Sequence, residues 1–273
     1  MDFNIKLKGG LILRGMIVSP GEKQRAIIIF VHGLGEHIQR YSHWVELLAG
    51  EGIGFTGMDL PGHGRSDGKR GYIKSYAHTD EMIEILLGNI SKTFPDLPVF
   101  IYGHSLGGGI ALDYILRKKP AIKGAIVTSP WLKLSFEPEK SKIILASIMK
   151  NILPGLIQPS GLVVDYISHD KDVVEKYKAD PLVHGKISVS LFHSAMNAGK
   201  HSLENAPDLT IPLLLMHGSD DLLCSPDGSR IFASKTGKAE LKIWEGGYHE
   251  LHNEPFKADV FAYLMKWINK QLS

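Results

Sequence analysis

The chain has 273 residues, of which 44% are hydrophobic and 22% charged, and its 31 basic and 29 acidic residues leave a formal charge of +2. This composition is typical of a globular protein, and the small net charge without a long basic run argues against a nucleic-acid surface. The single cysteine, Cys224, excludes a framework of intrachain disulfides and a zinc site built on cysteines, and it fits a reducing compartment.

The first residues of the chain predict a β-hairpin, because residues 3–8 and 11–18 flank the turn signal Gly9-Gly10. They carry no basic segment followed by an apolar core, which is the pattern of a secretory signal peptide. No apolar run approaches the ~20 residues that a membrane-spanning helix needs. We therefore expect a soluble protein located in the cytoplasm.

From residue 26 to residue 127, apolar runs typical of buried strands alternate with helical patterns. The predicted strands are 26–31, 53–58, a run that begins at 99 and ends in Gly-x-Ser-x-Gly, and 122–127. The predicted helices are 41–51, 76–94 and one that ends before Pro120. In the first of these helices, Trp44, Leu47 and Leu48 are spaced to share one buried face. Apolar strands that alternate with helices favour an α/β fold with a mostly parallel central sheet flanked by helices.

The stretch from Val99 to Gly108 is an apolar run that ends in Gly-x-Ser-x-Gly, directly before a helical pattern. This order of strand, sharp turn and helix is the context in which the motif presents a nucleophilic serine. Glycines on both sides of Ser105 permit the close approach of strand and helix that such a turn needs. The alternative is an ordinary glycine-rich turn, but the complete context predicts that Ser105 is a nucleophile.

A serine hydroxyl needs a general base, and that base needs an orienting carboxylate. In doubly wound hydrolases the acid and then the histidine follow the serine along the chain. Asp220 and Asp221 both follow an apolar strand. We expect Asp221 to be the acid, because Gly-x-x-Asp lets the loop turn before it presents the carboxylate. Asp220 is then expected to cap the loop through its side chain.

Two histidines follow the next predicted strand. His249 comes directly after Gly246-Gly247, where the chain can bend back toward Ser105, and it is the predicted base. His252 is expected to be an ordinary polar residue. The two histidines are three residues apart, but no third ligand is evident, so we predict neither a metal nor a cofactor.

An oxyanion formed at Ser105 needs two N–H donors, which we expect from the main chain. One is Leu106, the residue after the nucleophile, and the other is Leu34, in the loop after strand 26–31. Polar residues near these positions are expected to fix the loops, with headgroup binding as an alternative for the second group. They are Glu36, His37 and Arg40 beside Leu34, and Asp59, His63, Arg65 and Asp67 in the next loop.

Between residues 130 and 206 the regular alternation stops. Helical patterns over 140–149, 173–177 and 189–198 are separated by loops, and no run resembles a buried parallel strand. The alternation resumes with a strand at 211–217, a helix at 226–234, a strand at 239–244 and a closing helix at 255–272. We therefore predict a core of residues 1–129 and 207–273. Residues 130–206 form a helical cap inserted after the sixth strand, over the carboxyl edge of the sheet.

Five motifs occur in order at characteristic spacing, in residues 32–37, 59–68, 103–107, 218–221 and 245–249. Together they resemble the monoacylglycerol lipase branch of the α/β-hydrolase superfamily, whose relatives include lysophospholipases. The resemblance covers nearly the whole chain. It implies the α/β-hydrolase fold, a triad of Ser105, Asp221 and His249, and oxyanion donors at Leu34 and Leu106.

The resemblance also implies a substrate and a route to the site. The expected reaction is hydrolysis of monoacylglycerols to glycerol and a fatty acid, through an acyl-enzyme and without a cofactor. The cap is expected to form an apolar tunnel for the acyl chain and to contact a membrane surface transiently. Tyr177, in a segment that resembles one of the family, is a candidate for binding a glycerol hydroxyl or simply for packing within the cap.

Ile148 and Leu153 are further candidates, because the apolar stretch 143–157 is expected either to pack on the core or to line the acyl entrance. Cys224 matches a family cysteine near the site, and we expect it to be a small buried filler. A lysophospholipase or a short-chain carboxylesterase on the same triad is the alternative activity. A ligand-binding protein that kept the fold without catalysis is a more remote alternative, and the oligomeric state stays open.

Overall fold

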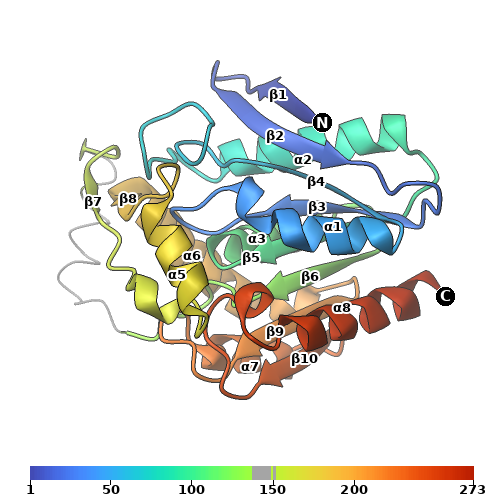
Figure 1. The fold of residues 1–273 in the computed structure, drawn as a ribbon. Helices are drawn as coiled ribbons and strands as arrows, with labels where there is room; N and C mark the ends of the chain where they lie inside the picture. Colours follow the sequence, from blue (N-terminus) through green and yellow to red (C-terminus); the bar gives the residue numbers. More distant parts are fainter. Residues whose placement is uncertain (137–148, 150–151) are drawn as a thin grey trace.

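The computed structural model describes residues 1–136, 149 and 152–273, and its centre is an eight-stranded sheet (Figure 1). The strand order is β1-β2-β4-β3-β5-β6-β9-β10, with β2 antiparallel to both of its neighbours and the other pairs parallel. The strands are β1 (Asp2–Lys6), β2 (Ile12–Val18), β3 (Ala26–Val31), β4 (Ile53–Met58), β5 (Val99–His104), β6 (Gly124–Thr128), β9 (Leu213–Gly218) and β10 (Ala239–Trp244).

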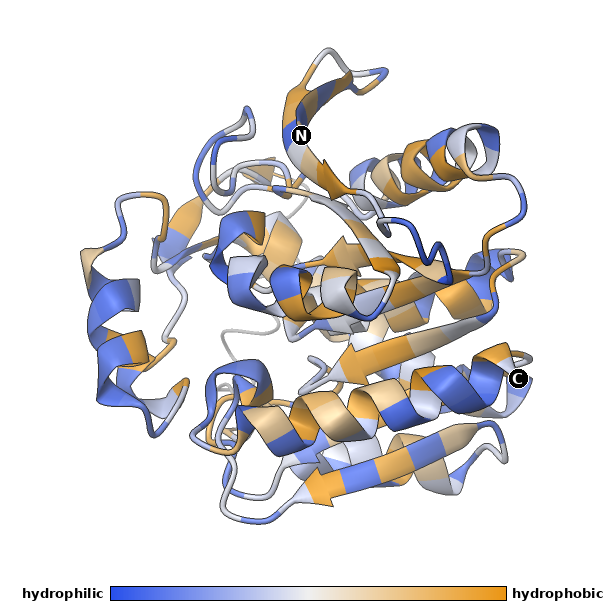
Figure 2. Ribbon diagram, turned by 45° about the vertical axis from the view of Figure 1, so that its right-hand side comes forward, coloured by the Kyte–Doolittle hydropathy of each residue, from blue (hydrophilic) through white to orange (hydrophobic). Residues whose placement is uncertain are grey.

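Helices cover both faces of the sheet, and alternate residues of β3 show why. Ile28 and Phe30 pack with residues of α1 (Ser42–Gly50) and α8 (Lys257–Leu272). Ile27 and Ile29 pack on the other face, with residues of α2 (Ala77–Thr93), α3 (Leu106–Lys118) and α7 (Pro226–Ser234). Successive side chains of a strand point to opposite faces, so a strand covered twice is apolar throughout. In Figure 2 the central strands are hydrophobic along their length, whereas the edge strand β10 alternates.

The predicted fold class is confirmed. The strands and helices predicted between residues 26 and 127 are present, with bounds that differ by at most about two residues. The strand predicted at 211–217 begins at Leu213, and the closing helix begins at Lys257, two residues after Pro255.

One prediction about α1 is wrong, because Leu47 is 47% exposed. The buried face of this helix consists of Trp44, Val45 and Leu48. At 3.6 residues per turn, position 47 lies roughly 100° from the centre of that face. The neighbouring elements therefore bury a narrower face of α1 than the spacing of its apolar residues indicates.

Where the structure describes it, the segment between β6 and β9 contains the α-helices α5 and α6 and a small antiparallel sheet. The helices are α5 (Lys171–Ala179) and α6 (Val189–Asn205), and the sheet consists of β7 (Ile157–Pro159) and β8 (Lys186–Ser188). The first two predicted helical patterns have different outcomes, because 173–177 lies within α5 whereas 140–149, except for Met149, lies outside the described residues. The strands β7 and β8 were not predicted, because three residues are too few to produce a recognisable pattern.

The parts of this segment lie in different surroundings. In Figure 1, β7, β8 and α5 lie beyond one end of the strands of the main sheet. By contrast, Leu191, Ala195 and Ala198 of α6 belong to the same apolar cluster as the residues of α3. The helix predicted at 189–198 is thus present, longer than expected, and packed on the core. The boundaries of the cap stay a prediction.

Among the described residues, no helix combines the length and the apolar character that crossing a membrane requires.

The turn between β5 and α3 holds Ser105 at φ 54° and ψ −119°, a backbone conformation that residues with a side chain rarely adopt. Close approaches on both sides of this turn require glycine. A Cβ at Gly103 would lie against the backbone of Gly107, and a Cβ at Gly107 would lie against the carbonyl oxygen of Val31 in β3. The amide of Ser105 donates to the carbonyl of Thr128 at 3.0 Å, which ties the turn to β6.

We predict that Gly107→Ala lowers the free energy of unfolding by about 2 kcal/mol or more, because α3 would have to move away from β3. Gly88→Ala is the matched control, since Gly88 lies in the interior of α2 with nothing within 4 Å of the added methyl group. Alanine there is expected to stabilise the protein by about 0.5–1 kcal/mol. Urea unfolding measures both values, and equal effects would contradict the packing argument.

Candidate active site

Three side chains from three different loops meet at the end of β5. The Ser105 hydroxyl lies 2.8 Å from Nε2 of His249, and Nδ1 of His249 lies 2.7 Å from Oδ2 of Asp221. All three residues are buried. The structure therefore brings together the predicted nucleophile, base and acid, in the order that allows a proton to pass from serine to histidine while the carboxylate orients the ring.

The loop after β9 positions Asp221 through its own backbone. Oδ1 of Asp221 accepts from the amides of Leu223 at 2.8 Å and Cys224 at 3.0 Å. Oδ2 lies 3.0 Å from Nε2 of His217, in addition to its contact with His249. Burial opposes ionisation of Asp221, but the charges and hydrogen bonds of the two histidines outweigh it and hold the pKa of the carboxyl well below its usual range.

Asp220 has different surroundings. Its side chain is exposed, and Oδ1 accepts a hydrogen bond from the Ser219 hydroxyl at 2.6 Å. Ser219 in turn accepts from the amide of Gly246 at 2.8 Å. Asp220 thus takes part in local contacts of the loop, and it is Asp221 that reaches His249.

Charges around His249 favour its protonated form. Burial alone would lower the pKa of the imidazole, but the charge and hydrogen bond of Asp221, followed by the charges of Glu250 and Glu36, raise it above its usual value. The backbone carbonyl of His249 accepts from the Ser129 hydroxyl at 2.7 Å, which fixes the loop. A histidine in this environment can take the proton of Ser105 and hold it until a leaving group needs it.

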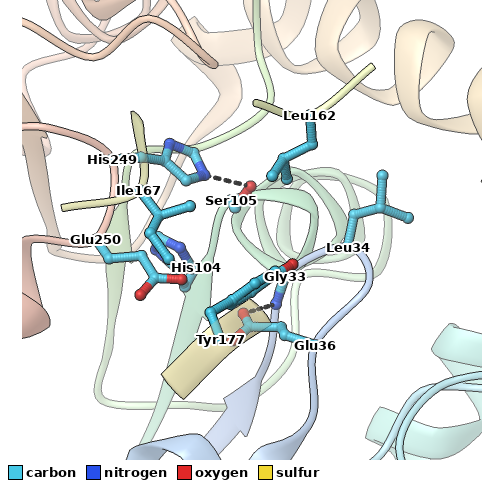
Figure 3. Close-up of a pocket in the computed structure, with 10 residues that line it drawn as sticks. All are labelled: Gly33, Leu34, Glu36, His104, Ser105, Leu162, Ile167, Tyr177, His249 and Glu250. Atoms are coloured by element: carbon cyan, nitrogen blue, oxygen red, sulfur yellow. Dashed lines mark hydrogen bonds between the residues drawn. The ribbon is translucent and has the colours of Figure 1, made fainter. Parts of the chain in front are cut away.

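The loop after β3 lies against the serine. A Cβ at Gly33 would be 3.2 Å from Cβ of Ser105, so Leu34 follows at the point where the loop borders the site. The Gly33 amide donates to Oε1 of Glu36 at 2.6 Å, which closes the loop on itself (Figure 3). Leu106 is the first residue of α3, where backbone N–H groups have no acceptor within the helix. Of the two predicted oxyanion donors, Leu34 lines the same pocket as Ser105 and Leu106 follows Ser105 directly in the chain.

Figure 3 shows the residues that line a pocket at the serine. The pocket is small, with a volume of about 10 Å³. Three of its lining residues come from the segment between β6 and β9: Leu162, Ile167 and Tyr177. Of the predicted substrate contacts, only Tyr177 lines this pocket. Leu153 is 52% exposed and lies elsewhere, and Ile148 lies outside the described residues.

Glu36, His37 and Arg40 were expected to brace the oxyanion loop, and the structure divides them between two contacts. Glu36 and Arg40 form an ion pair, with Nη1 of Arg40 2.6 Å from Oε2 of Glu36. His37 instead contacts Asp180, just after α5, with Nε2 2.8 Å from Oδ2. Sequence reasoning missed Glu250, which also binds Arg40, although its place directly after the predicted base was a usable signal.

In the loop after β4, the acidic side chains bind backbone amides and so have a structural role. Asp59 is fully buried and accepts from the amides of Ile38 at 2.8 Å and Arg65 at 2.7 Å. Asp67 accepts from the amide of Ile12 at 3.1 Å, and none of these residues lines the pocket at Ser105. Cys224 is buried close to the triad, where burial and the charge of Asp221 raise the pKa of its thiol and make it an inert group.

No group of three or more histidine, cysteine or acidic side chains is placed to hold a metal ion within the part of the chain that the structure describes.

His252 lies behind the triad and was not predicted to be buried. Its ring stacks on Tyr41 with 4.6 Å between centroids and meets His104 at 5.0 Å, and it is completely buried. Neither of its ring nitrogens has a hydrogen-bond partner among the described residues. Burial is the main cause that lowers the pKa of His252 to about 3.

This environment gives His252 a predictable effect on stability. Its pKa rises from about 3 in the native state to 6.5 when unfolded, so between these values the unfolded chain binds one more proton. The free energy of unfolding therefore falls as the pH drops from 6.5 toward 3, by up to ~1.4 kcal/mol per pH unit. We predict that His252→Phe removes this contribution. Urea unfolding between pH 7 and pH 4 measures it, and parallel curves for variant and wild type would refute the assignment.

Comparison with known proteins agrees with this geometry. The family model described as serine aminopeptidase S33 matches residues 22–256. A monoacylglycerol lipase of Mycolicibacterium smegmatis is 31% identical, covering 97% of this chain and 95% of that protein. A phospholipase of Bacillus subtilis is 32% identical, covering 86% of this chain and 92% of that protein.

Solved structures extend the likeness to three dimensions. The crystal structure of a monoacylglycerol lipase of Paleococcus ferrophilus superposes with a TM-score of 0.88 at 30% identity, covering 95% of this chain and 99% of that one.

A longer relative also matches by sequence. An abhydrolase domain-containing protein of Dictyostelium discoideum is 36% identical over 93% of this chain, and the chain spans 27% of that protein's length. The chain therefore belongs to the serine aminopeptidase S33 family of α/β hydrolases, in the branch that includes the monoacylglycerol lipases.

Proposed function

We propose that the chain is a serine esterase that hydrolyses monoacylglycerols to glycerol and a free fatty acid. The observation that carries this proposal is the continuous hydrogen-bonded series from Ser105 through His249 to Asp221. Relatives named as monoacylglycerol lipases, which match almost the full length of the chain, support the choice of substrate.

The reaction proceeds in two halves. His249 takes the proton of Ser105 as Oγ attacks the ester carbonyl, and a tetrahedral intermediate forms with its negative charge on the former carbonyl oxygen. The amides of Leu34 and Leu106 donate to that oxygen, an interaction whose loss costs about 3 kcal/mol per donor. Protonated His249, held by Asp221, then gives its proton to the glycerol oxygen as the C–O bond breaks. Water repeats the sequence on the acyl-enzyme and releases the fatty acid.

The assignment of a cap rests on the residues that line the pocket. We propose that residues 130–206 form this cap over the core of residues 1–129 and 207–273. Tyr177 lines the pocket with its ring against Arg40, 4.5 Å from the ring centroid to Cζ, and its hydroxyl is the proposed contact for a glycerol hydroxyl. Leu162 and Ile167 supply the apolar wall against which an acyl chain would pack.

Transient contact with a lipid surface is the proposed role of exposed apolar residues in the same segment. Ile152, Leu153 and Leu156 are 64%, 52% and 46% exposed, and they follow one another within five residues. Large apolar side chains gathered at a surface favour an apolar partner. A location in the cytoplasm agrees with the single buried cysteine.

We predict that Ser105→Ala abolishes both monoacylglycerol hydrolysis and covalent labelling by a fluorophosphonate, because it removes the hydroxyl that His249 contacts and activates. Hydrolysis is followed by release of fatty acid, and labelling by the mass of the intact protein. The control is thermal unfolding, in which a folded variant gives the same cooperative transition as the wild type. Labelling that persists in the variant would refute Ser105 as the nucleophile. A wild type that is neither labelled nor active would favour a binding protein.

Asp221→Asn is predicted to slow fluorophosphonate labelling and ester hydrolysis by about 10⁴-fold, because the imidazole loses the carboxylate that sets its orientation and tautomer. Asp220→Asn is the matched control on the adjacent residue. It is expected to leave both rates within about twofold, since its carboxylate contacts Ser219. The reverse ranking of the two variants would show that Asp220 is the acid.

The substrate is tested with esters that share one acyl chain and differ in headgroup. Monoacylglycerol is expected to give a higher kcat/KM than the matching lysophosphatidylcholine. The similarity to a phospholipase makes lysophospholipase activity the second candidate. A faster reaction with lysophosphatidylcholine would establish that candidate, and a preference for short acyl chains would indicate a carboxylesterase.

A further inference from the structure

Three separate parts of the chain meet at one guanidinium group, that of Arg40. Its Nη1 donates to Oε2 of Glu36 at 2.6 Å and to Oε1 of Glu250 at 2.7 Å, while Nη2 donates to Oε2 of Glu250 at 2.7 Å. The ring of Tyr177, from α5, covers its face. The side chains of Arg40, Glu36 and Glu250 are only 9%, 3% and 4% exposed, so water does not compete for these contacts.

Each carboxylate also belongs to one of two catalytic loops, Glu36 to the oxyanion loop and Glu250 to the loop that carries His249. Oε1 of Glu36 accepts from the Gly33 amide at 2.6 Å, and Gly33 directly precedes the oxyanion donor Leu34. Glu250 directly follows His249, and its Oε2 also accepts from Asn253 at 2.7 Å. The oxyanion loop and the loop of the base are therefore bound to the same planar group, Glu36 through Nη1 alone and Glu250 through both Nη1 and Nη2.

We propose that Arg40 is a positioning residue that holds the oxyanion loop and the His249 loop at a fixed separation by binding Glu36 and Glu250 together. This inference rests on the proposed function, because it assigns Arg40 to the geometry of that reaction. Arginine suits the task because its rigid fork fixes angles as well as distances. A misplacement of about 1 Å between reacting groups can cost on the order of 100-fold in rate.

The cluster of Arg40, Glu36 and Glu250 also affects His249 through its net charge. Two carboxylates share one guanidinium, which leaves one negative charge buried beside His249. The charges of Glu250 and Glu36, after that of Asp221, help to raise the pKa of the imidazole. The other groups around His249 are the Ser105 hydroxyl and the rings of His104 and His252. The negative cluster therefore stabilises the imidazolium that forms when Ser105 attacks.

The first test separates geometry from charge with Arg40→Lys. Lysine keeps the positive charge but cannot bind both carboxylates in a fork. The second-order rate constant of fluorophosphonate labelling is measured from pH 5 to pH 9. We expect the plateau rate to fall about 10- to 100-fold while the acid limb, which reports protonation of His249, stays at the same pH. An unchanged plateau would overturn the positioning role.

Arg117→Lys is the matched control. Arg117 also binds two carboxylates, those of Asp80 at 2.9 Å and Asp113 at 2.7 Å. It lies twelve residues beyond Ser105, about 18 Å further along α3. The same substitution there is expected to leave the labelling rate and its pH profile unchanged. Equal losses in both variants would show a general effect on stability and would overturn the proposal.

The second test removes charge with Glu36→Gln. One negative charge near His249 is lost, so protonation of the imidazole becomes less favourable and the acid limb is expected to move to lower pH. An acid limb that stays in place would refute the electrostatic part of the proposal. Labelling does not depend on the natural substrate, so these results stand even if monoacylglycerols prove to be the wrong esters. Labelling of Ser105→Ala would instead refute the proposed function itself.

Discussion

Ser105 occupies a strained turn between a central parallel strand and the helix behind it, and the place of this turn in the sheet constrains the rest of the site. The carboxyl ends of parallel strands meet at one edge, where the loops after them also begin. The loops after β3, β9 and β10 can therefore reach the serine with few residues. His249 is 144 residues away along the chain from Ser105, and yet a short loop after β10 brings it within hydrogen-bond distance.

Burial makes the charges of this site effective, and it also makes them costly unless each has a partner. Asp221 is stabilised by two amides and two histidines, which together hold it ionised away from water. Glu36 and Glu250 are stabilised by Arg40 in the same way. Two ionic groups with different partners thus lie close to His249. One orients the ring directly, and the other sets the position and charge of the loops around it.

The segment between β6 and β9 is joined to the oxyanion loop as well as to the pocket. The amide of His184 donates to the carbonyl of Gly35 at 2.9 Å, and Asp180 contacts His37 at 2.8 Å. Tyr177 covers Arg40 nearby. A movement of this segment would therefore displace the loop that carries Leu34. Contacts of this kind couple what lies above the serine to the geometry of the reaction beneath it.

The sequence by itself determined the order of strands and helices, the Gly-x-Ser-x-Gly turn and the choice of Asp221 and His249 as partners for Ser105. These features are local, because periodicity, glycine spacing and chain order follow from a few neighbouring residues. Tertiary structure alone decided the partners of Arg40, the burial of His252, the exposure of Leu47 and the packing of α6 on α3. Each of these depends on residues distant in the chain that share a surface only after folding. No local pattern encodes which distant side chain will occupy the other side of a contact.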